Sequence, residues 1–439
     1  MKRQFAIAGV LLLGLAAAAV AQTSDSFIEQ IGSGNTATVT QTGTGGNTND
    51  SVVSQTGDGN NTAVVVQGGT GNSNTSSITQ RDKGGNSATV GQGGSGNTNI
   101  SIIDQLGNGG GNTVNSVTQT GTSNFNTSTI TQNGNGGGNQ TSVTQDGTGN
   151  LNTSTINQLG AGGGNKATVV QEGDDNTNTS TITQNGPGGD NEVYSVTQKG
   201  MDNINTSTIT QSEGGGNNWT TILQEGTNNR NISILTQRGG GGGNITTVIQ
   251  GGTDNIGGTK RNRSEILQDG GGGDNFTMVT QTATNSESRS TITQMGGSAK
   301  GGGNNNTTVD QSGNSTKNIS TVTQQGAGGF NVTEVKQGED FNNNTSTITQ
   351  QQTVGHNEAY VWQHGSNNIN LSTILQQDSG HQTADVEQFG SGNQNTSNIH
   401  QFGPGGFNTA TVSQSGIGNT NLSTINQNGG SNTATVTQK

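Results

Sequence analysis

The chain has 439 residues, a length that would allow several globular domains. Only 23% of the residues are hydrophobic and 3% aromatic, whereas typical soluble domains are about 45–50% apolar, so an ordinary hydrophobic core is excluded. The formal net charge of −12 and the absence of cysteine argue against nucleic acid as a partner and exclude stabilisation by disulfides.

The first 21 residues have the features of a secretory signal peptide. Lys2 and Arg3 give a charged start, an apolar run extends from Phe5 to Val20, and Ala19-Val20-Ala21 is a cleavage site of small residues. We therefore expect a signal peptide at 1–21, a short mature N-terminus at 22–25 and a secreted, extracellular protein. No later segment has the roughly 20 apolar residues that a membrane span needs, so no span is expected in the mature form.

From Ser26 onward a two-part repeat fills the chain, with 16 copies of each half and a full period near 26 residues. One half reads N-x-S-x-I-x-Q, as in Asn126, Ser128, Ile130 and Gln132. The other half reads N-x-A-x-V-x-Q, as in Asn165, Ala167, Val169 and Gln171. Spacing by twos places the recurring residues on one face of a strand, and the Gly- and Asn-rich segments between the halves tolerate tight turns. The sequence predicts an all-β fold over 26–439, a β-solenoid of about 16 strand-arc-strand rungs without helices.

The recurring residues are predicted to point into the solenoid, and the positions between them, where Thr dominates, to point outward. Threonine suits an exposed strand surface. Folding the two strands about the arc after Gln132 brings this residue opposite Asn139 and places Ile130 opposite Thr141. Each large side chain then meets a smaller one, which keeps a thin core at constant width.

The inward Asn and Gln need hydrogen-bond partners, because a buried amide without one costs about 1–3 kcal/mol. Gln132 lies one rung from Gln158, and Gln158 one rung from Gln184, so their amides can pair along a ladder. A rung alone is unstable, because its Ile and Val contribute roughly 1.5–3 kcal/mol each, whereas ordering about 26 residues costs at least about 1 kcal/mol per residue. Stacking of rungs must supply the difference.

Both ends of the solenoid are predicted to lack caps. The first strand begins at Ser26, close to the predicted cleavage point, and the last strand, Asn432 to Gln438, is followed only by Lys439. Exposed strand edges are templates for another chain. We therefore expect the molecules to stack end to end as a homopolymer in a cross-β fibre.

The first unit of the repeat resembles the curlin repeat, S-x5-Q-x-G-x2-N-x-A-x-V-x-Q, and the similarity extends over nearly all of the mature chain. The resemblance implies a subunit of curli, the amyloid fibres of bacterial biofilm matrix that act in surface adhesion. A nucleator subunit and an outer-membrane secretion channel would be further partners. The chain departs from the family in its many repeats, its longer arcs and its short segment at 22–25, so the role of a dedicated channel stays open, as does the choice between nucleator and major subunit. The residues taken to represent the amyloid core are Ser26, Ile28, Gln30, Asn35, Ala37, Val39, Gln41, Asn126, Ser128, Ile130, Gln132, Asn165, Ala167, Val169, Gln171, Asn432, Ala434, Val436 and Gln438.

Some units depart from the regular repeat length. The arc from Gly251 to Arg261 is longer than the others, and its charged region includes Lys260 and Arg263; the segment from Met295 to Asn304 is extended too. Such arcs either slow premature assembly or are drift tolerated on the surface. The spacing around Asn112 and Asn191 predicts bulged strands.

Other chemistry is weakly indicated. Four histidines lie near the end of the chain, and His356 and His381 are about one rung apart, which leaves a weak metal site open. No nucleophile–base–acid set stands out, so neither an enzyme nor a cofactor is expected. Alternative functions are an ice-binding solenoid with outward Thr columns, such as Thr179 and Thr181, and a monomeric solenoid adhesin. A disordered chain with local repeats is the last alternative.

Overall fold

The computed structural model describes residues 22–81, 84–106, 111–133, 137–161, 163–186, 190–212, 217–238, 243–254, 261–270, 275–296, 305–326, 329–352, 355–377, 380–403 and 406–439. The predicted signal peptide at 1–21 lies outside the described residues. The chain divides into two compact units, Met1–Asp202 and Asn203–Lys439.

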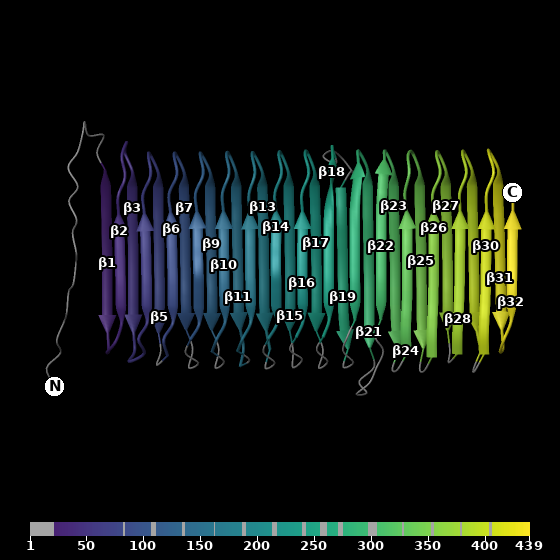
Figure 1. Cartoon of the computed structure of the whole chain (residues 1–439), viewed down its shortest axis with the longest axis horizontal. Coiled ribbons are helices and arrows are strands. Elements are labelled where there is room, and N and C mark those ends of the chain that lie inside the picture. Colours follow the sequence, from purple (N-terminus) through teal and green to yellow (C-terminus); the bar gives the residue numbers. More distant parts are fainter. Residues whose placement is uncertain are drawn as a thin grey trace. The chain divides into compact units, whose positions relative to one another are not determined.

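Both units are parallel β-solenoids whose strands alternate along the chain between two sheets, A and B (Figure 1). In the first unit, sheet A contains β1 (Thr23–Ile31), β3 (Thr48–Thr56), β5 (Ser73–Arg81), β7 (Thr98–Leu106), β9 (Phe125–Asn133), β11 (Leu151–Leu159) and β13 (Thr177–Asn185). Sheet B of this unit contains β2 (Thr36–Gln41), β4 (Thr62–Gln67), β6 (Ser87–Gln92), β8 (Thr113–Gln119), β10 (Gln140–Gln145), β12 (Lys166–Gln171) and β14 (Glu192–Gln198).

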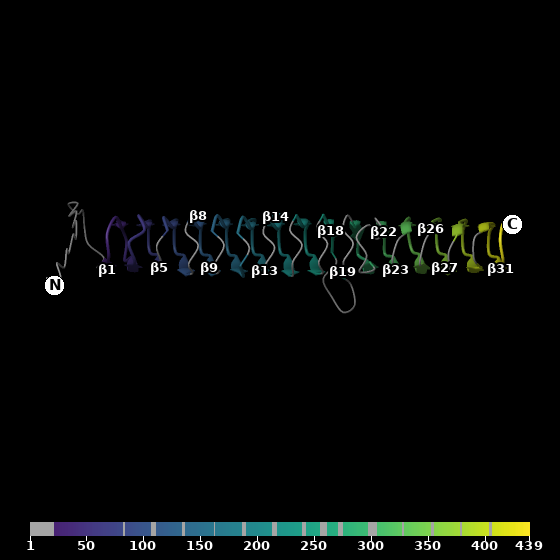
Figure 2. The same ribbon diagram turned by 90° about the horizontal axis from the view of Figure 1, so that it is seen from below.

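The second unit repeats this arrangement. Its sheet A contains β15 (Ile204–Ser212), β17 (Arg230–Arg238), β19 (Arg261–Gly270), β21 (Glu287–Gly296), β23 (Lys317–Gly326), β25 (Asn343–Gln352), β27 (Ile369–Gln377), β29 (Gln394–Phe402) and β31 (Thr420–Asn428). Its sheet B contains β16 (Trp219–Gln224), β18 (Ile245–Thr253), β20 (Phe276–Thr284), β22 (Asn306–Asn314), β24 (Gly329–Gln337), β26 (Gly355–Gln363), β28 (Gly380–Gln388), β30 (Gly406–Gln414) and β32 (Thr433–Gln438). Figure 2 shows the odd-numbered and even-numbered strands on opposite sides of each rung.

The register places identical residues above one another. Ile130, Ile156 and Ile182 are successive partners in sheet A, as expected from the repeat. The side chains of these three residues are fully buried. The alternation of buried and exposed positions confirms the inward face that the sequence predicts, and it confirms an all-β solenoid in which the described residues form no helix.

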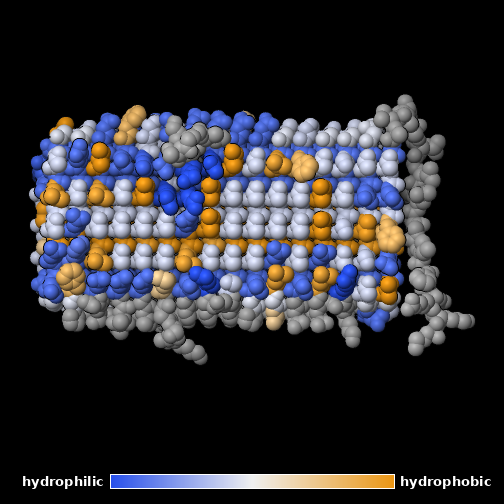
Figure 3. All heavy atoms as spheres, turned by 180° about the vertical axis from the view of Figure 1, so that it is seen from behind, coloured by the Kyte–Doolittle hydropathy of each residue, from blue (hydrophilic) through white to orange (hydrophobic). Residues whose placement is uncertain are grey.

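The outward positions hold mostly threonine, and these threonines also stack in register. Thr153 pairs with Thr127 and Thr179, and each is only half-buried. In Figure 3 much of one outer face consists of rows of intermediate hydropathy, with a continuous hydrophobic row between them and single hydrophobic and hydrophilic residues interrupting the rows. The sheet carries these residues outside, while the glutamine and isoleucine or valine positions of its interior recur from rung to rung.

Glycine is needed where an arc turns close to the next rung. Gly147 has a φ of 115°, and a Cβ there would lie 1.9 Å from the carbonyl oxygen of Gly173. Only glycine adopts this backbone conformation without strain and leaves room for the neighbouring carbonyl. The arc in turn lets Thr148 pair with Thr122 and Asp174 across the rungs.

The predicted bulges are present. The pairing of β10 with β8 shifts register between Thr141 and Ser142, and the pairing of β12 with β14 shifts between Ala167 and Val169. In both cases the bulged strand has 7 residues instead of 6. The early positions of Asn112 and Asn191 are therefore absorbed within the strand.

The bounds predicted for the long charged arc, Gly251 to Arg261, are wrong. Gly251 pairs with Thr282 inside β18, and Arg261 and Arg263 pair with residues of β21 inside β19. Residues 255–260, including Lys260, lie outside the described residues, as does most of the extended segment after Met295. Arg263 thus belongs to the outer face of a strand, where it forms an ion pair with Glu265.

Candidate assembly site: the interior amide ladders

A ladder of glutamine side chains runs along sheet A. In the first unit Gln132 Nε2 donates a hydrogen bond of 2.8 Å to Gln158 Oε1, and Gln158 Nε2 donates one of 2.9 Å to Gln184 Oε1. The three side chains are almost fully buried. Each amide therefore receives a hydrogen bond from the preceding rung and donates one to the following rung, which satisfies the buried carbonyl of the side chain.

The second proton of each glutamine amide links the two sheets. Gln145, in sheet B, donates to Gln171 Oε1 at 2.8 Å and to the backbone carbonyl of Thr127, in sheet A, at 3.0 Å. Gln158, in sheet A, donates to the carbonyl of Asn165 at 3.0 Å. This contact supports the expected arrangement in which the Gln that closes one strand faces the Asn that precedes the next.

Threonine extends this network in the second unit, where it occupies the Ala position of several sheet B strands. Gln268 Nε2 donates to Thr277 Oγ1 at 3.1 Å, and Thr277 Oγ1 donates to Gln294 Oε1 at 2.8 Å. Gln294 in turn donates to Thr307 Oγ1 at 3.1 Å. The hydroxyl thus joins the glutamines of successive rungs, and linked hydrogen bonds of this kind polarise and strengthen one another.

Asparagine forms further columns, two of them at the start of the sheet A strands. At the start of the sheet A motif, Asn152 Nδ2 donates to Asn126 Oδ1 at 2.9 Å, towards the preceding rung and thus opposite to the glutamines. Two residues earlier, Asn150 binds the arc: its backbone N–H donates to Asn124 Oδ1 at 2.8 Å, and its side chain donates to the carbonyl of Gly173 at 2.6 Å. The sequence-based set omitted this second column, although the recurring N-x-N spacing was a visible signal.

A column of serines completes the interior of sheet A. Ser128, Ser154 and Ser180 are fully buried register partners. Their Oγ atoms have no hydrogen-bond partner among the described residues. The serines therefore act by size, as small residues in a thin core, and their hydroxyls carry a desolvation cost that the amide ladders do not.

The end rungs are less buried than the interior. Ile28 of β1 and Val39 of β2 are half-buried, whereas their register partners Val53 and Val65 are completely buried. At the other end Val436 of β32 is half-buried as well. The inward residues of β1, β2 and β32 thus keep part of their surface accessible, whereas Ile425 and Gln427 of β31 are buried.

The structure places most predicted core residues inside the solenoid. In the interior rungs all eight are buried: Asn126, Ser128, Ile130, Gln132, Asn165, Ala167, Val169 and Gln171. In the first and last rungs ten are half-buried: Ile28, Gln30, Asn35, Ala37, Val39, Gln41, Asn432, Ala434, Val436 and Gln438. Ser26 is exposed.

The two histidines predicted to lie one rung apart are register partners. His356 of β26 and His381 of β28 stack at 5.7 Å between ring centroids; Phe330 stacks on His356, and Phe407 lies tilted against His381. His400 lies in β29 of the other sheet. Within the described parts of the chain, no three His, Cys, Asp or Glu side chains are grouped closely enough to hold a metal ion.

None of the described residues form a helix with the length and apolarity of a membrane span. No protein-family model matches the chain, and a search of curated proteins finds no significant similarity.

Proposed function

We propose that the chain is the structural subunit of an extracellular, curli-like amyloid fibre that serves in biofilm matrix and surface adhesion. The curlin-like spacing of the repeat supports the family resemblance. The observation that carries the proposal is that the side-chain amides of the two end rungs have complementary hydrogen-bonding groups available, acceptors in one rung and donors in the other.

The glutamine ladders give these rungs opposite requirements. In the first rung the Oε1 atoms of Gln30 and Gln41 accept no hydrogen bond from another described residue, while their Nε2 atoms donate to the next rung at 2.7 and 2.9 Å. In the last rung Gln427 and Gln438 donate one proton each, to the carbonyls of Thr409 and Leu422. In other rungs the second amide proton is donated to the glutamine of the following rung, as Gln401 donates to Gln427 and Gln414 to Gln438. A second copy of the chain supplies the matching acceptors, so head-to-tail stacking continues the ladder and, since it is heterologous, gives an open filament.

Assembly of the chain from Gln22 to Lys439 tests this proposal by electron microscopy and fibre diffraction. We expect fibres with strands perpendicular to the axis and a reflection near 4.7–4.8 Å. Gln438→Glu keeps the acceptor for Gln414 but removes the donor to the next copy, so the critical concentration should rise about tenfold or more. Thr437→Glu, which adds the same charge at an exposed neighbour, is the matched control. A folded β protein that stays monomeric at high concentration would refute the fibre.

An ice-binding solenoid is the second candidate, supported by the in-register outward threonines. Thr129, Thr155 and Thr181 form one such column in the first unit. The array is interrupted in the second unit by Ile232, which pairs with Arg263. Thermal hysteresis of a freezing solution would favour this function, and its absence would leave the fibre.

A further inference from the structure

The outer face of sheet B changes character in the second unit. In β22, β24, β26 and β28 the outward positions carry charged and aromatic side chains where threonine is common elsewhere. These residues are Asp310, Glu334, Lys336, Glu358, Tyr360, Trp362, Asp385 and Glu387. The interior glutamine ladder continues unchanged beneath them, with Gln337 donating to Gln363 Oε1 at 2.8 Å. The change is therefore confined to the outside and needs an explanation other than the fold.

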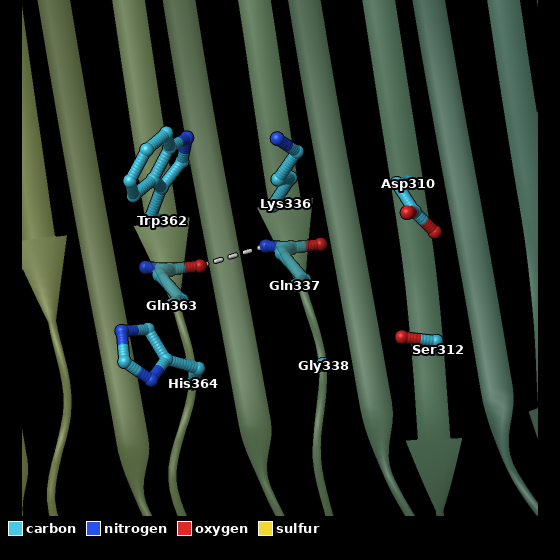
Figure 4. Close-up of a pocket in the computed structure, with 8 residues that line it drawn as sticks. All are labelled: Asp310, Ser312, Lys336, Gln337, Gly338, Trp362, Gln363 and His364. Atoms are coloured by element: carbon cyan, nitrogen blue, oxygen red, sulfur yellow. Dashed lines mark hydrogen bonds between the residues drawn. The ribbon is translucent and has the colours of Figure 1, made fainter.

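A hollow of about 260 Å³ lies in this face (Figure 4). Asp310, Lys336 and Trp362 are successive register partners on three neighbouring strands and line one level of the hollow. Ser312 and His364 line the level beyond, with Gly338 between them. A Cβ at Gly338 would lie 3.0 Å from Ser312 Oγ, so a side chain there would fill part of this space.

The polar groups of the hollow are of both kinds, donors and acceptors. Lys336 Nζ lies 2.6 Å from Glu334 and 5.1 Å from the centre of the Trp362 ring. Asp310 makes no hydrogen bond or ion pair with another described residue, and burial raises the pKa of its carboxyl, an effect that Lys336 opposes. The ring of His364 is held by stacking on Phe389 at 5.3 Å and by Glu387, 3.6 Å from Nε2.

This arrangement selects against a charged ligand. A cation would meet the ammonium of Lys336, and an anion would meet the carboxylate of Asp310. A neutral ligand rich in hydroxyls suits both groups, because each hydroxyl donates and accepts. The indole of Trp362, 41% exposed, provides an apolar wall with a polar edge. The volume is slightly below the about 300–1,000 Å³ of pockets for whole small molecules, which fits one ring of a longer chain.

We propose that this hollow binds one sugar ring of a neutral carbohydrate chain. The ring packs against Trp362, its hydroxyls donate to Asp310 and Ser312, and Lys336 and His364 donate to its oxygens. The site lies on the outward face of one sheet, so it is independent of whether the chain forms fibres.

The chain has only two tryptophans, which provides a matched pair of probes. Trp219 of β16 is 46% exposed and pairs with Ile245, away from the hollow. Trp219→Phe leaves Trp362 as the sole indole, and Trp362→Phe leaves Trp219. We would titrate both variants with cellohexaose, maltohexaose and mannohexaose, and with oligomers of chitosan and polygalacturonate as cationic and anionic comparisons, and follow tryptophan fluorescence.

We expect at least one neutral hexasaccharide to change the emission of Trp362 saturably and to leave Trp219 unchanged. Asp310→Asn, added to Trp219→Phe, should weaken this binding about tenfold or more, because the ligand loses a hydrogen bond to a charged group. Unchanged circular dichroism and assembly would show that the variants fold. The proposal is overturned if no neutral sugar binds, if only a charged oligomer binds, if Trp219 responds equally, or if Asp310→Asn has no effect.

Discussion

The side-chain amide of Gln158 donates a hydrogen bond of 2.9 Å to that of Gln184, one rung further along sheet A. Both side chains are buried, so the bond replaces hydration that these amides would have in the unfolded chain. This contact explains why Gln closes nearly every strand.

We expect replacement of Gln158 and Gln184 by Ala to lower the free energy of unfolding by about 1–3 kcal/mol for each amide left unpaired. Replacing the outward Thr155 and Thr181 by Ser should cost much less, since these residues are half-buried. Denaturant unfolding and fibre growth rates measure both effects. Equal losses would show that the inward and outward faces contribute alike.

The buried serines should respond in the opposite direction. Ser128, Ser154 and Ser180 have unpartnered hydroxyls, so Ser→Ala at the three positions should raise the free energy of unfolding, by up to about 1 kcal/mol each. The half-buried Thr155→Ser serves as a control for loss of side-chain atoms without this gain. Destabilisation of the triple Ala variant in urea would mean that the hydroxyls have partners in solution.

Two glycines of the first unit give a sharp contrast. Gly147→Ala should destabilise the protein by more than about 1–3 kcal/mol, since its positive φ and the 1.9 Å approach to Gly173 both oppose a Cβ. At Gly91, in β6, a Cβ would meet nothing within 4 Å. Gly91→Ala should therefore be neutral or slightly stabilising. Thermal unfolding of the two variants compares them directly, and similar midpoints would contradict the arc geometry.

The outward carboxyl group of Asp385 should make the stability of the protein depend on pH. Burial, and then the neighbouring Glu387, raises the pKa of Asp385, so the ionised carboxylate is less favourable in the folded than in the unfolded chain. Asp385→Asn should thus stabilise the protein at neutral pH, and the gain should vanish as the pH falls below the ordinary Asp value of about 3.9. Unfolding curves at several pH values test this; a gain that persists in acid would assign it to another cause.

The long arc between β18 and β19 should be dispensable for stability. Gln237 binds Gln268 at 2.8 Å although 31 residues separate them, compared with 26 for most rungs. Deletion of Ile256–Thr259 should then leave fibre diffraction unchanged, because arc length affects closure entropy only weakly. A shorter lag before growth would identify the segment as a brake on assembly, an unchanged lag would favour drift, and loss of fibres would contradict our placement of these rungs.

Much of the fold could be predicted because the spacing of residues within the repeat determines the strands and their buried faces. The spacing of Asn126, Ser128, Ile130 and Gln132 defines a strand and its buried face, and repetition defines the stacking. The function of Thr277 as a link between glutamines could not be predicted, because it depends on which side chain lies across the thin core. The hollow at Trp362 was missed for a related reason: Asp310, Lys336 and Trp362 are about 26 residues apart, and only the parallel register brings them together.

Because like residues stack above one another, most interior positions do not distinguish one rung from the next. If the stacking register were shifted by one whole rung, Ile would again lie over Ile and Gln over Gln, and the interior contacts would have nearly the same energy. What distinguishes one rung from another lies mostly outside, in features such as the charged and aromatic residues of β22–β28, and inside only in substitutions such as Thr277 at an alanine position. The periodic interior residues therefore stabilise the stack, whereas the aperiodic outward residues make each rung recognisable to a binding partner.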